Sequence, residues 1–150
     1  MKNRCHYETC IGTICIEEMN NEVIALFIDK NFNNKEDCET DILRETNKQL
    51  QEYFNKQRKI FDVPINLIGT EFQKKVWNAL RDIPYGETRS YGEIAKAIGQ
   101  PKACRAIGGA NNKNPIMIIV PCHRVIGSKG DLVGFGAGLK TKKFLLDIEK

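Results

Sequence analysis

The sequence predicts an α+β protein in two parts, with an N-terminal antiparallel sheet and helix in residues 1–66 and a mostly helical domain in residues 67–150. Two observations predict this division. Short runs of β-forming residues separated by turn residues fill residues 6–29. Helical spacing and helix-capping residues dominate the C-terminal part. A chain of 150 residues can bury a core in one domain or in two small ones.

The first elements form an antiparallel meander. One strand runs to about Cys10, and two more cover residues 14–16 and 23–28. Turn residues separate them at Gly12-Thr13 and Asn20-Asn21. Nothing in this half assembles a site, so we interpret it as scaffold.

A helix follows from Glu39 to about Lys56, because its apolar residues recur at helical spacing. This stripe consists of Ile42, Leu43, Leu50, Tyr53 and Phe54. The stripe predicts packing on one face of the sheet. Pro64 to Leu67 is then expected to be an extended linker.

Closely spaced helices begin at Thr70, which is a good N-cap for an amphipathic helix that ends near Ile83. Ser90 caps a second helix over residues 91–98, and Gly99 ends it.

A third helix is expected from about Pro101 to Asn111, and with the second it resembles a helix-turn-helix. It carries Lys102 and Arg105 among small residues. Those small residues are Ala103, Ala106, Gly108, Gly109 and Ala110. They either let another helix approach closely or let the backbone approach a DNA groove. The basic side chains favour DNA.

Three further segments complete the C-terminal part. Residues 127–131 are typical of a hairpin loop or wing, and residues 134–138 form a glycine-rich stretch whose backbone can approach a ligand. A last helix covers residues 141–150, with Phe144 among its inward-facing residues.

The most informative segment surrounds Cys122. Residues 118–120 read as a buried strand that Pro121 terminates, so the chain turns at the cysteine. His123 and Arg124 follow, which gives the thiol a proton acceptor and its thiolate a nearby cation. The alternative is a cysteine that serves as a small core hydrophobe.

Charge is distributed unevenly between the two parts. Residues 1–66 carry nine Lys/Arg and twelve Asp/Glu, whereas residues 67–150 carry fourteen and seven. The basic part contains Cys122, which favours a polyanionic partner such as nucleic acid over a merely solvated basic surface.

The cysteines and the N-terminus indicate which class of protein this is and in which compartment it is expected. Six cysteines form no CxxC pair and only two histidines accompany them, so we expect no metal and no cofactor. The start of the chain is polar and no apolar run is long enough to span a bilayer. These features predict a soluble, cytoplasmic protein with reduced thiols.

Several motifs together resemble the O6-alkylguanine-DNA alkyltransferases, also called methylated-DNA–protein-cysteine methyltransferases. The similarity runs from about residue 69 to Glu149, and the N-terminal part fits the family's ribonuclease-H-like first domain more loosely. The motifs are Gly69-Thr70-Glu71-Phe72, Val76-Trp77, Ile83-Pro84-Tyr85-Gly86-Glu87-Thr88, Ser90-Tyr91, Arg105-Ala106-Ile107-Gly108, Asn114-Pro115 and Pro121-Cys122-His123-Arg124-Val125.

The resemblance implies catalytic roles for five residues. Cys122 would accept the alkyl group, His123 would take the thiol proton through a bridging water, and Glu149 would orient His123. Tyr91 would donate a hydrogen bond to the guanine, and Asn114 would brace the turn before the cysteine.

The resemblance also implies a winged-helix-like domain bound to duplex DNA through the minor groove. Arg105 would replace the flipped base in the stack. The other implied DNA contacts are Ala106, Gly108, Gly109, Arg124, Ser90 and Lys102. The implied pocket residues are Val125, Phe135, Gly136, Ala137, Met117 and Lys142. Of these, Phe135, Gly136, Ala137 and Met117 depart from common family residues, and such departures bear on which bulky alkyl groups fit.

The implied function is DNA repair by irreversible, single-turnover transfer of an alkyl group from O6-alkylguanine, and O4-alkylthymine, to Cys122. The resemblance suggests a protein that is monomeric and does not bind a membrane. Three alternatives are a non-enzymatic binder of alkylated DNA, a helix-turn-helix regulator and a cysteine hydrolase.

Overall fold

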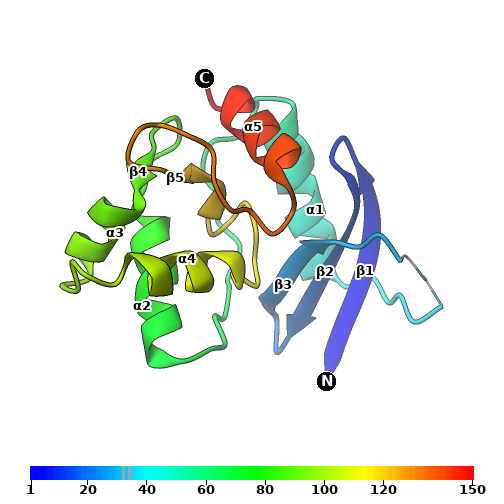
Figure 1. Cartoon of the computed structure of the whole chain (residues 1–150). Coiled ribbons are helices and arrows are strands. Elements are labelled where there is room, and N and C mark those ends of the chain that lie inside the picture. Colours follow the sequence, from blue (N-terminus) through cyan, green and yellow to red (C-terminus); the bar gives the residue numbers. More distant parts are fainter. Residues whose placement is uncertain (32, 34) are drawn as a thin grey trace. The chain divides into compact units, whose positions relative to one another are not determined.

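The computed structural model describes residues 1–31, 33 and 35–150, which form two compact units, Met1–Ile68 and Gly69–Lys150 (Figure 1). The sequence placed this boundary after Asn66. Each unit has its own secondary structure and core. Among the described residues, none of the helices combines the length and apolar character needed to span a bilayer.

The first unit contains a three-stranded antiparallel sheet in the order β1-β2-β3, which confirms the meander (Figure 1). The strands are β1 (Lys2–Thr9), β2 (Gly12–Met19) and β3 (Glu22–Ile28). Asn20 and Asn21 connect β2 to β3 with φ of 54° and 63°. Asparagine tolerates this left-handed backbone, which matches the twist of a tight hairpin.

Helix α1 (Asp41–Phe54) packs on this sheet, and it is shorter at both ends than predicted. Its fully buried side chains include Leu43, Leu50 and Tyr53. Residues three, four and seven apart share a helix face, which explains why the apolar stripe located this contact correctly.

The expected linker at Pro64–Leu67 is not free chain. The Val23 amide donates to the Pro64 carbonyl, and the Asn66 amide donates to the Val23 carbonyl, both at 2.9 Å. Ile65 thus pairs in parallel with the edge of β3. The segment uses backbone groups that an edge strand would otherwise leave unpaired.

A buried histidine joins three segments of this unit. His6 Nδ1 lies 2.8 Å from Asp37 Oδ1, and its Nε2 lies 2.9 Å from Asp29 Oδ2. Burial alone would lower the pKa of His6, but the hydrogen bonds to the two carboxylates raise it above its ordinary value. The imidazole therefore links β1, the end of β3 and the segment before α1, and the two carboxylates favour its protonated form.

The second unit is mostly helical and has a small parallel sheet (Figure 1). Its elements are α2 (Glu71–Arg81), β4 (Arg89–Ser90), α3 (Tyr91–Ala97), α4 (Cys104–Asn112), β5 (Val125–Ile126) and α5 (Leu139–Ile148). Thr70 and Ser90 both form complete capping boxes, as their positions predicted. Gly99 follows α3 with φ of 76°, a conformation that suits glycine after a helix.

Helix α4 begins at Cys104 and not at Pro101. The Ala103 amide donates to the Gln100 carbonyl at 3.0 Å, which closes a turn with Pro101 at its second position. Proline is favoured there because its φ is already set. The same residue was expected to start a helix, and the turn accounts for the difference.

The predicted strand before Cys122 is wrong. The Ile119 amide bonds to the Met117 carbonyl at 2.8 Å and the Val120 amide to the Ile116 carbonyl at 3.0 Å. Ile118 adopts φ of 71°, which is rare for a β-branched residue. The apolar run is therefore a tight buried turn, since apolar composition alone does not distinguish a turn from a strand.

Helix α5 and the loop after β5 differ in detail from what the sequence predicted. Leu145 and Ile148 are buried, but Phe144 is 40% exposed because it lies about 100° around the helix from Leu145. The Gly127 amide donates to the Asp131 carbonyl at 2.8 Å, which closes the expected loop. No return strand follows it in the described part of the chain.

Candidate active site

Cys122 opens a 3₁₀ turn, Cys122–Arg124, and only 4% of its surface is exposed. Asn114 holds the turn that precedes it. The Asn114 amide nitrogen donates to the Val120 carbonyl at 2.7 Å, and its oxygen accepts from the Ile116 amide at 3.0 Å. One side chain therefore joins both ends of the turn, which fixes where the backbone delivers the cysteine.

Burial raises the pKa of the Cys122 thiol to about 11. The Asn114 amide and the Lys142 ammonium oppose this increase but do not cancel it. At neutral pH the resting side chain is therefore a thiol. The sequence predicted a cation near the sulfur, but burial has the larger effect on this pKa.

His123 is fully buried, and its Nε2 lies 2.7 Å from Oε2 of Glu149. Glu149 also accepts hydrogen bonds from Arg124 Nε at 2.8 Å and Nη2 at 3.0 Å. An ionised carboxylate can only accept, so the network assigns the proton to Nε2 of the imidazole. Burial lowers the pKa of His123 more than Glu149 raises it, so the ring is neutral.

This arrangement leaves Nδ1 of His123 as a proton acceptor. Nδ1 is buried and has no hydrogen-bond partner among the described residues. It belongs to the residue next to Cys122, and its lone pair is the basic site of the neutral ring. The pair of Cys122 and His123 thus presents a protonated thiol and an imidazole able to accept a proton.

Arg124 does not have the DNA-contacting position that was expected. It is 7% exposed, and its guanidinium binds Glu149 and donates from Nη1 to the Ile83 carbonyl at 2.7 Å. The guanidinium carbon also lies 5.8 Å from the centre of the Tyr85 ring. The planar guanidinium fits this buried bidentate pair, so its charge neutralises Glu149 and does not face solvent.

Tyr91 and Lys142 meet at one backbone carbonyl. The Tyr91 hydroxyl donates to the Val133 carbonyl at 3.1 Å, and the Lys142 ammonium donates to it at 3.0 Å. Lys142 Nζ also lies 5.9 Å from the Phe135 ring centre. Burial raises the pKa of Tyr91, and the negative charge of Cys122, once the sulfur is a thiolate, raises it further, so the hydroxyl remains a donor.

The other expected pocket residues lie on three segments. Met117 and Val125 are buried in the turn and in β5, whereas Gly136 and Ala137 belong to the loop before α5. A Cβ at Gly136 would lie 3.4 Å from the Asn112 carbonyl, a tight contact with backbone. The loop therefore passes close to the end of α4 at this glycine.

Helix α4 exposes a face of small and basic residues. Arg105, Ala106 and Gly109 are exposed on it, and Lys102 is exposed in the preceding turn. Gly108 faces the Tyr91 ring, since a Cβ there would lie 3.9 Å from a ring carbon. Ser90 lies apart from this face, at the α3 N-cap, where its hydroxyl accepts from the Glu93 amide at 3.1 Å.

Comparison with known proteins decides which family has this arrangement. The model of the ribonuclease-like domain of 6-O-methylguanine DNA methyltransferase matches residues 5–67, and that of its DNA-binding domain matches residues 71–150. The chain belongs to the 6-O-methylguanine DNA methyltransferase family.

Individual members of the methyltransferase family are similar over most of the chain. A methylated-DNA–protein-cysteine methyltransferase of Methanosarcina acetivorans is 62% identical over 109 residues, which cover 73% of this chain and 70% of the relative. The constitutive enzyme of Bacillus subtilis is 48% identical over 153 residues, which cover 95% and 92%.

Solved structures of the family agree with the fold. The crystal structure of Mycobacterium tuberculosis O6-methylguanine methyltransferase has a TM-score of 0.91 at 42% identity, over 100% of this chain and 93% of that chain. Mycobacterium tuberculosis OGT in complex with DNA has a TM-score of 0.90 at 43% identity, over 99% and 92%.

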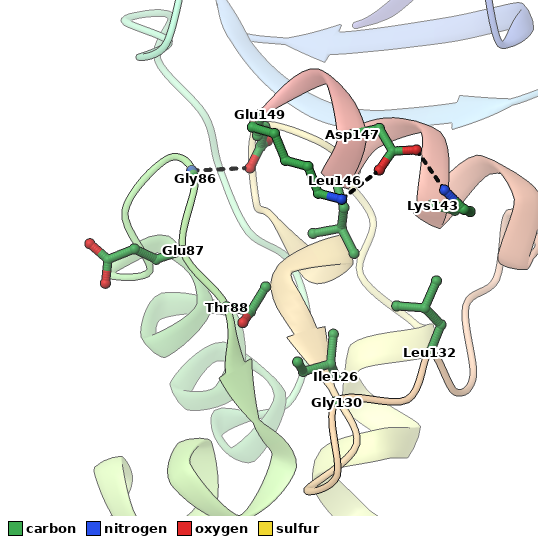
Figure 2. A pocket seen from close by; sticks show the side chains of 11 residues that line it. Gly86, Glu87, Thr88, Ile126, Gly130, Leu132, Lys143, Leu146, Asp147 and Glu149 are labelled. Carbon is green, nitrogen blue, oxygen red and sulfur yellow. Dashed lines mark hydrogen bonds and ion pairs between the residues drawn. The ribbon is translucent and has the colours of Figure 1, made fainter.

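A cavity of about 270 Å³ lies on another side of Glu149 (Figure 2). Its apolar wall includes Ile126, Leu132 and Leu146, and the Gly86 amide approaches Oε1 of Glu149 at 3.5 Å. The described residues that line it include neither the cysteine nor the tyrosine of the site. We therefore separate this cavity from the methyltransferase site.

Two further properties of this methyltransferase concern metals and thiols. In the described part of the chain, no cluster of three or more His, Cys, Asp or Glu side chains could hold a metal ion. All six cysteines are free thiols.

Sequence reasoning did not identify three groups that hold the side chains of the site in place. Asn111 is 2% exposed, and its amide nitrogen lies 3.4 Å from the Cys122 carbonyl. The carbonyls of Ile83 and Val133 receive the cationic side chains. A backbone carbonyl has no sequence signature, and Asn111 is indistinguishable in the sequence from its exposed neighbour Asn112.

Proposed function

We propose that the protein repairs DNA by transferring an alkyl group from O6 of guanine to the sulfur of Cys122, once per molecule. The observation that carries this proposal is the neutral His123, bonded through Nε2 to Glu149 at 2.7 Å, next to a protonated cysteine thiol. Membership of the methyltransferase family and the names of its similar relatives support it.

The chemical step is an in-line displacement. The thiol proton passes to Nδ1 of His123 through a water, and Glu149 stabilises the imidazolium that forms. The sulfur then bonds to the alkyl carbon as the carbon–O6 bond breaks, and the electron pair remains on the guanine. Tyr91 supplies a hydrogen bond to the departing base, and the imidazolium of His123 balances the negative charge left on it. The thioether formed on Cys122 is stable, so the molecule reacts once.

The base has to leave the duplex before the thiol can reach it. Flipping costs roughly a few kcal/mol of stacking and pairing. We infer that α4 lies in the minor groove, where Arg105 fills the place of the flipped base and Ala106 and Gly109 allow close approach. The exposure of these three residues on one helix supports this docking.

The inferred partner is duplex DNA, bound by a monomer. A similar protein, Mycobacterium tuberculosis OGT, has been solved in complex with DNA, and the basic charge of residues 67–150 suits phosphate contacts. We infer a cytoplasmic location because the proposed substrate is chromosomal DNA.

Intact-mass measurement tests the proposal. The protein is incubated with a duplex oligonucleotide that carries one O6-methylguanine, at a molar excess of DNA. We expect the protein mass to rise by one methyl-for-hydrogen exchange and to stop there, and peptide mapping should locate the group on Cys122. Parallel reactions with O4-methylthymine DNA and with free O6-benzylguanine define the substrate range.

Two variants complete this experiment. Cys122→Ser should show no transfer, whereas Cys104→Ser should react like wild type, because Cys104 is an exposed thiol. Unmodified wild type after prolonged incubation, or several lesions repaired per molecule, would reject the proposal.

A further inference from the structure

Two orphaned polar atoms lie beside the reactive cysteine. Among the described residues, three buried side-chain polar atoms lack a hydrogen-bond partner: Thr40 Oγ1, Asn111 Oδ1 and His123 Nδ1. Thr40 belongs to the first unit, whereas the other two belong to the second. A buried polar atom without a partner costs free energy, so each such atom requires an explanation.

The Asn111 side chain contacts the peptide group that joins Cys122 to His123. The Asn111 amide nitrogen lies 3.4 Å from the carbonyl of Cys122, and that carbonyl is bonded directly to the His123 nitrogen. The Asn111 nitrogen is thereby assigned as the donor, and Oδ1 remains as an acceptor. Two buried acceptors, Oδ1 and Nδ1, therefore belong to a residue that contacts the Cys122 carbonyl and to the residue that follows Cys122 in the chain.

The thiol of Cys122 is a donor, and Asn111 Oδ1 and His123 Nδ1 are acceptors. Together they match the hydrogen bonds that a single water molecule can make. A water accepts from one group and donates to two, and buried waters typically make about three hydrogen bonds. A water held by the thiol alone and Nδ1 could rotate, whereas a third partner fixes its orientation. The position of that third partner decides whether the water passes a proton from sulfur to imidazole.

We propose that Asn111 is a positioning residue for the proton transfer from Cys122. Its Oδ1 accepts one hydrogen of the relay water, and the other hydrogen is directed at Nδ1 of His123. The thiol proton moves to the water as a water proton moves to Nδ1, which leaves thiolate, water and imidazolium. This inference rests on the proposed function and adds a residue to which the family resemblance assigns no role.

Asn111→Leu tests the inference in the full chain. Leucine has a similar volume but no acceptor, so we expect the single-turnover rate of transfer from O6-methylguanine DNA to fall about tenfold or more. DNA affinity should stay within about twofold of wild type, because a 2% exposed residue does not contact DNA. The melting temperature should change little, because leucine fills the volume of the buried amide and the hydrogen bond lost to the Cys122 carbonyl is a long one, at 3.4 Å.

Asn111→Asp distinguishes positioning from a merely structural role. While its carboxyl group is neutral, one oxygen can accept from the water and the O–H can donate to the Cys122 carbonyl, as the amide does. Burial raises the pKa of such a group. We expect a rate close to wild type at acidic pH and a decline as the pH rises through that pKa, a decline that wild type does not show.

The control is Asn78→Leu on α2, which makes the same exchange at an exposed position. It should react like wild type. If wild type transfers the methyl group and Asn111→Leu matches its rate, the role of Asn111 is rejected while the proposed function stands. A loss of rate accompanied by lost stability or DNA affinity, with no pH-dependent recovery in Asn111→Asp, also rejects it. Failure of wild type itself rejects the proposed function.

Discussion

The proton on Cys122 controls when the sulfur becomes reactive. Its pKa is raised to about 11 by burial, so the thiolate fraction grows about tenfold for each pH unit below that value. We expect alkylation of Cys122 by iodoacetamide, in the absence of DNA, to increase by about this factor per unit from pH 7 to pH 9.5. Peptide mass spectrometry at each pH measures it, and a plateau before pH 8 would contradict the expectation.

Glu149 is the second residue whose charge matters, because it neutralises Arg124 and orients His123 at once. Glu149→Gln keeps the shape but leaves a buried guanidinium without a counter-ion. Removing one partner of such a pair typically costs about 3 kcal/mol of unfolding free energy. We also expect slower methyl transfer, since a neutral amide stabilises the imidazolium less well.

Urea unfolding and single-turnover transfer measure the two effects of Glu149→Gln. Glu87→Gln serves as the matched control, because Glu87 is exposed and forms an ion pair with the nearby Arg89 at the surface. Equal stability and equal rate in Glu149→Gln and the control would show that the buried charge has neither role.

Among the elements, α4 combines poor helix formers with an exposed face. A Cβ at Gly109 would have no described atom within 4 Å, so a side chain fits there without disturbing the protein. Gly109→Leu should therefore raise the unfolding free energy by about 0.7 kcal/mol through helix propensity. DNA affinity should fall roughly tenfold, equivalent to about 1.4 kcal/mol, because the leucine would hold α4 away from the groove.

Thermal unfolding and fluorescence anisotropy with a duplex oligonucleotide separate these opposite effects of Gly109→Leu. Asn78→Leu adds the same side chain to an exposed position of α2 and should leave affinity unchanged. Affinity that rises along with stability would contradict minor-groove docking of α4.

Elements with local signals could be predicted from the sequence. The capping boxes at Thr70 and Ser90 and the glycine after α3 are formed by residues within a few positions of each other, and all three are present. The turn before Cys122 depends on Asn114 bonding to Val120, and an apolar run does not reveal that bond. The run was therefore assigned to a strand.

At the scale of the whole molecule, the His6 link makes stability depend on pH. The folded-state pKa of His6 is raised, so its contribution is fully present below the unfolded value of about 6.5 and is lost as the pH rises through the folded value. We expect His6→Gln to destabilise the first unit by roughly 2 kcal/mol at pH 5.5. The difference from wild type should shrink at pH 8.5.

Amide hydrogen exchange in β1 and β2 measures the stability of this unit in the intact protein. Asp29→Asn removes one carboxylate of the same link and should show the same trend with pH. A difference between His6→Gln and wild type that is equal at both pH values would contradict a charged imidazole.

The parts of the candidate site formed by residues adjacent in the sequence were predictable. The contacts between residues far apart in the sequence were not. Cys122 and His123 are neighbours in the sequence, but Glu149 reaches His123 from a helix 26 positions away. Periodicity places Glu149 only on the flank of α5, and the family resemblance supplied its role. The resemblance placed Arg124 among the DNA contacts, whereas the fold directs its buried guanidinium to Glu149.

The burial of Cys122 has a consequence for the protein after it has reacted. A thioether carries at least one carbon more than the thiol it replaces, in a site where only 4% of the residue is exposed. Overpacking a well-filled interior typically costs about 1–3 kcal/mol. Transfer of the alkyl group thus introduces strain around Cys122. The alkylated protein should therefore unfold more readily than the unreacted protein.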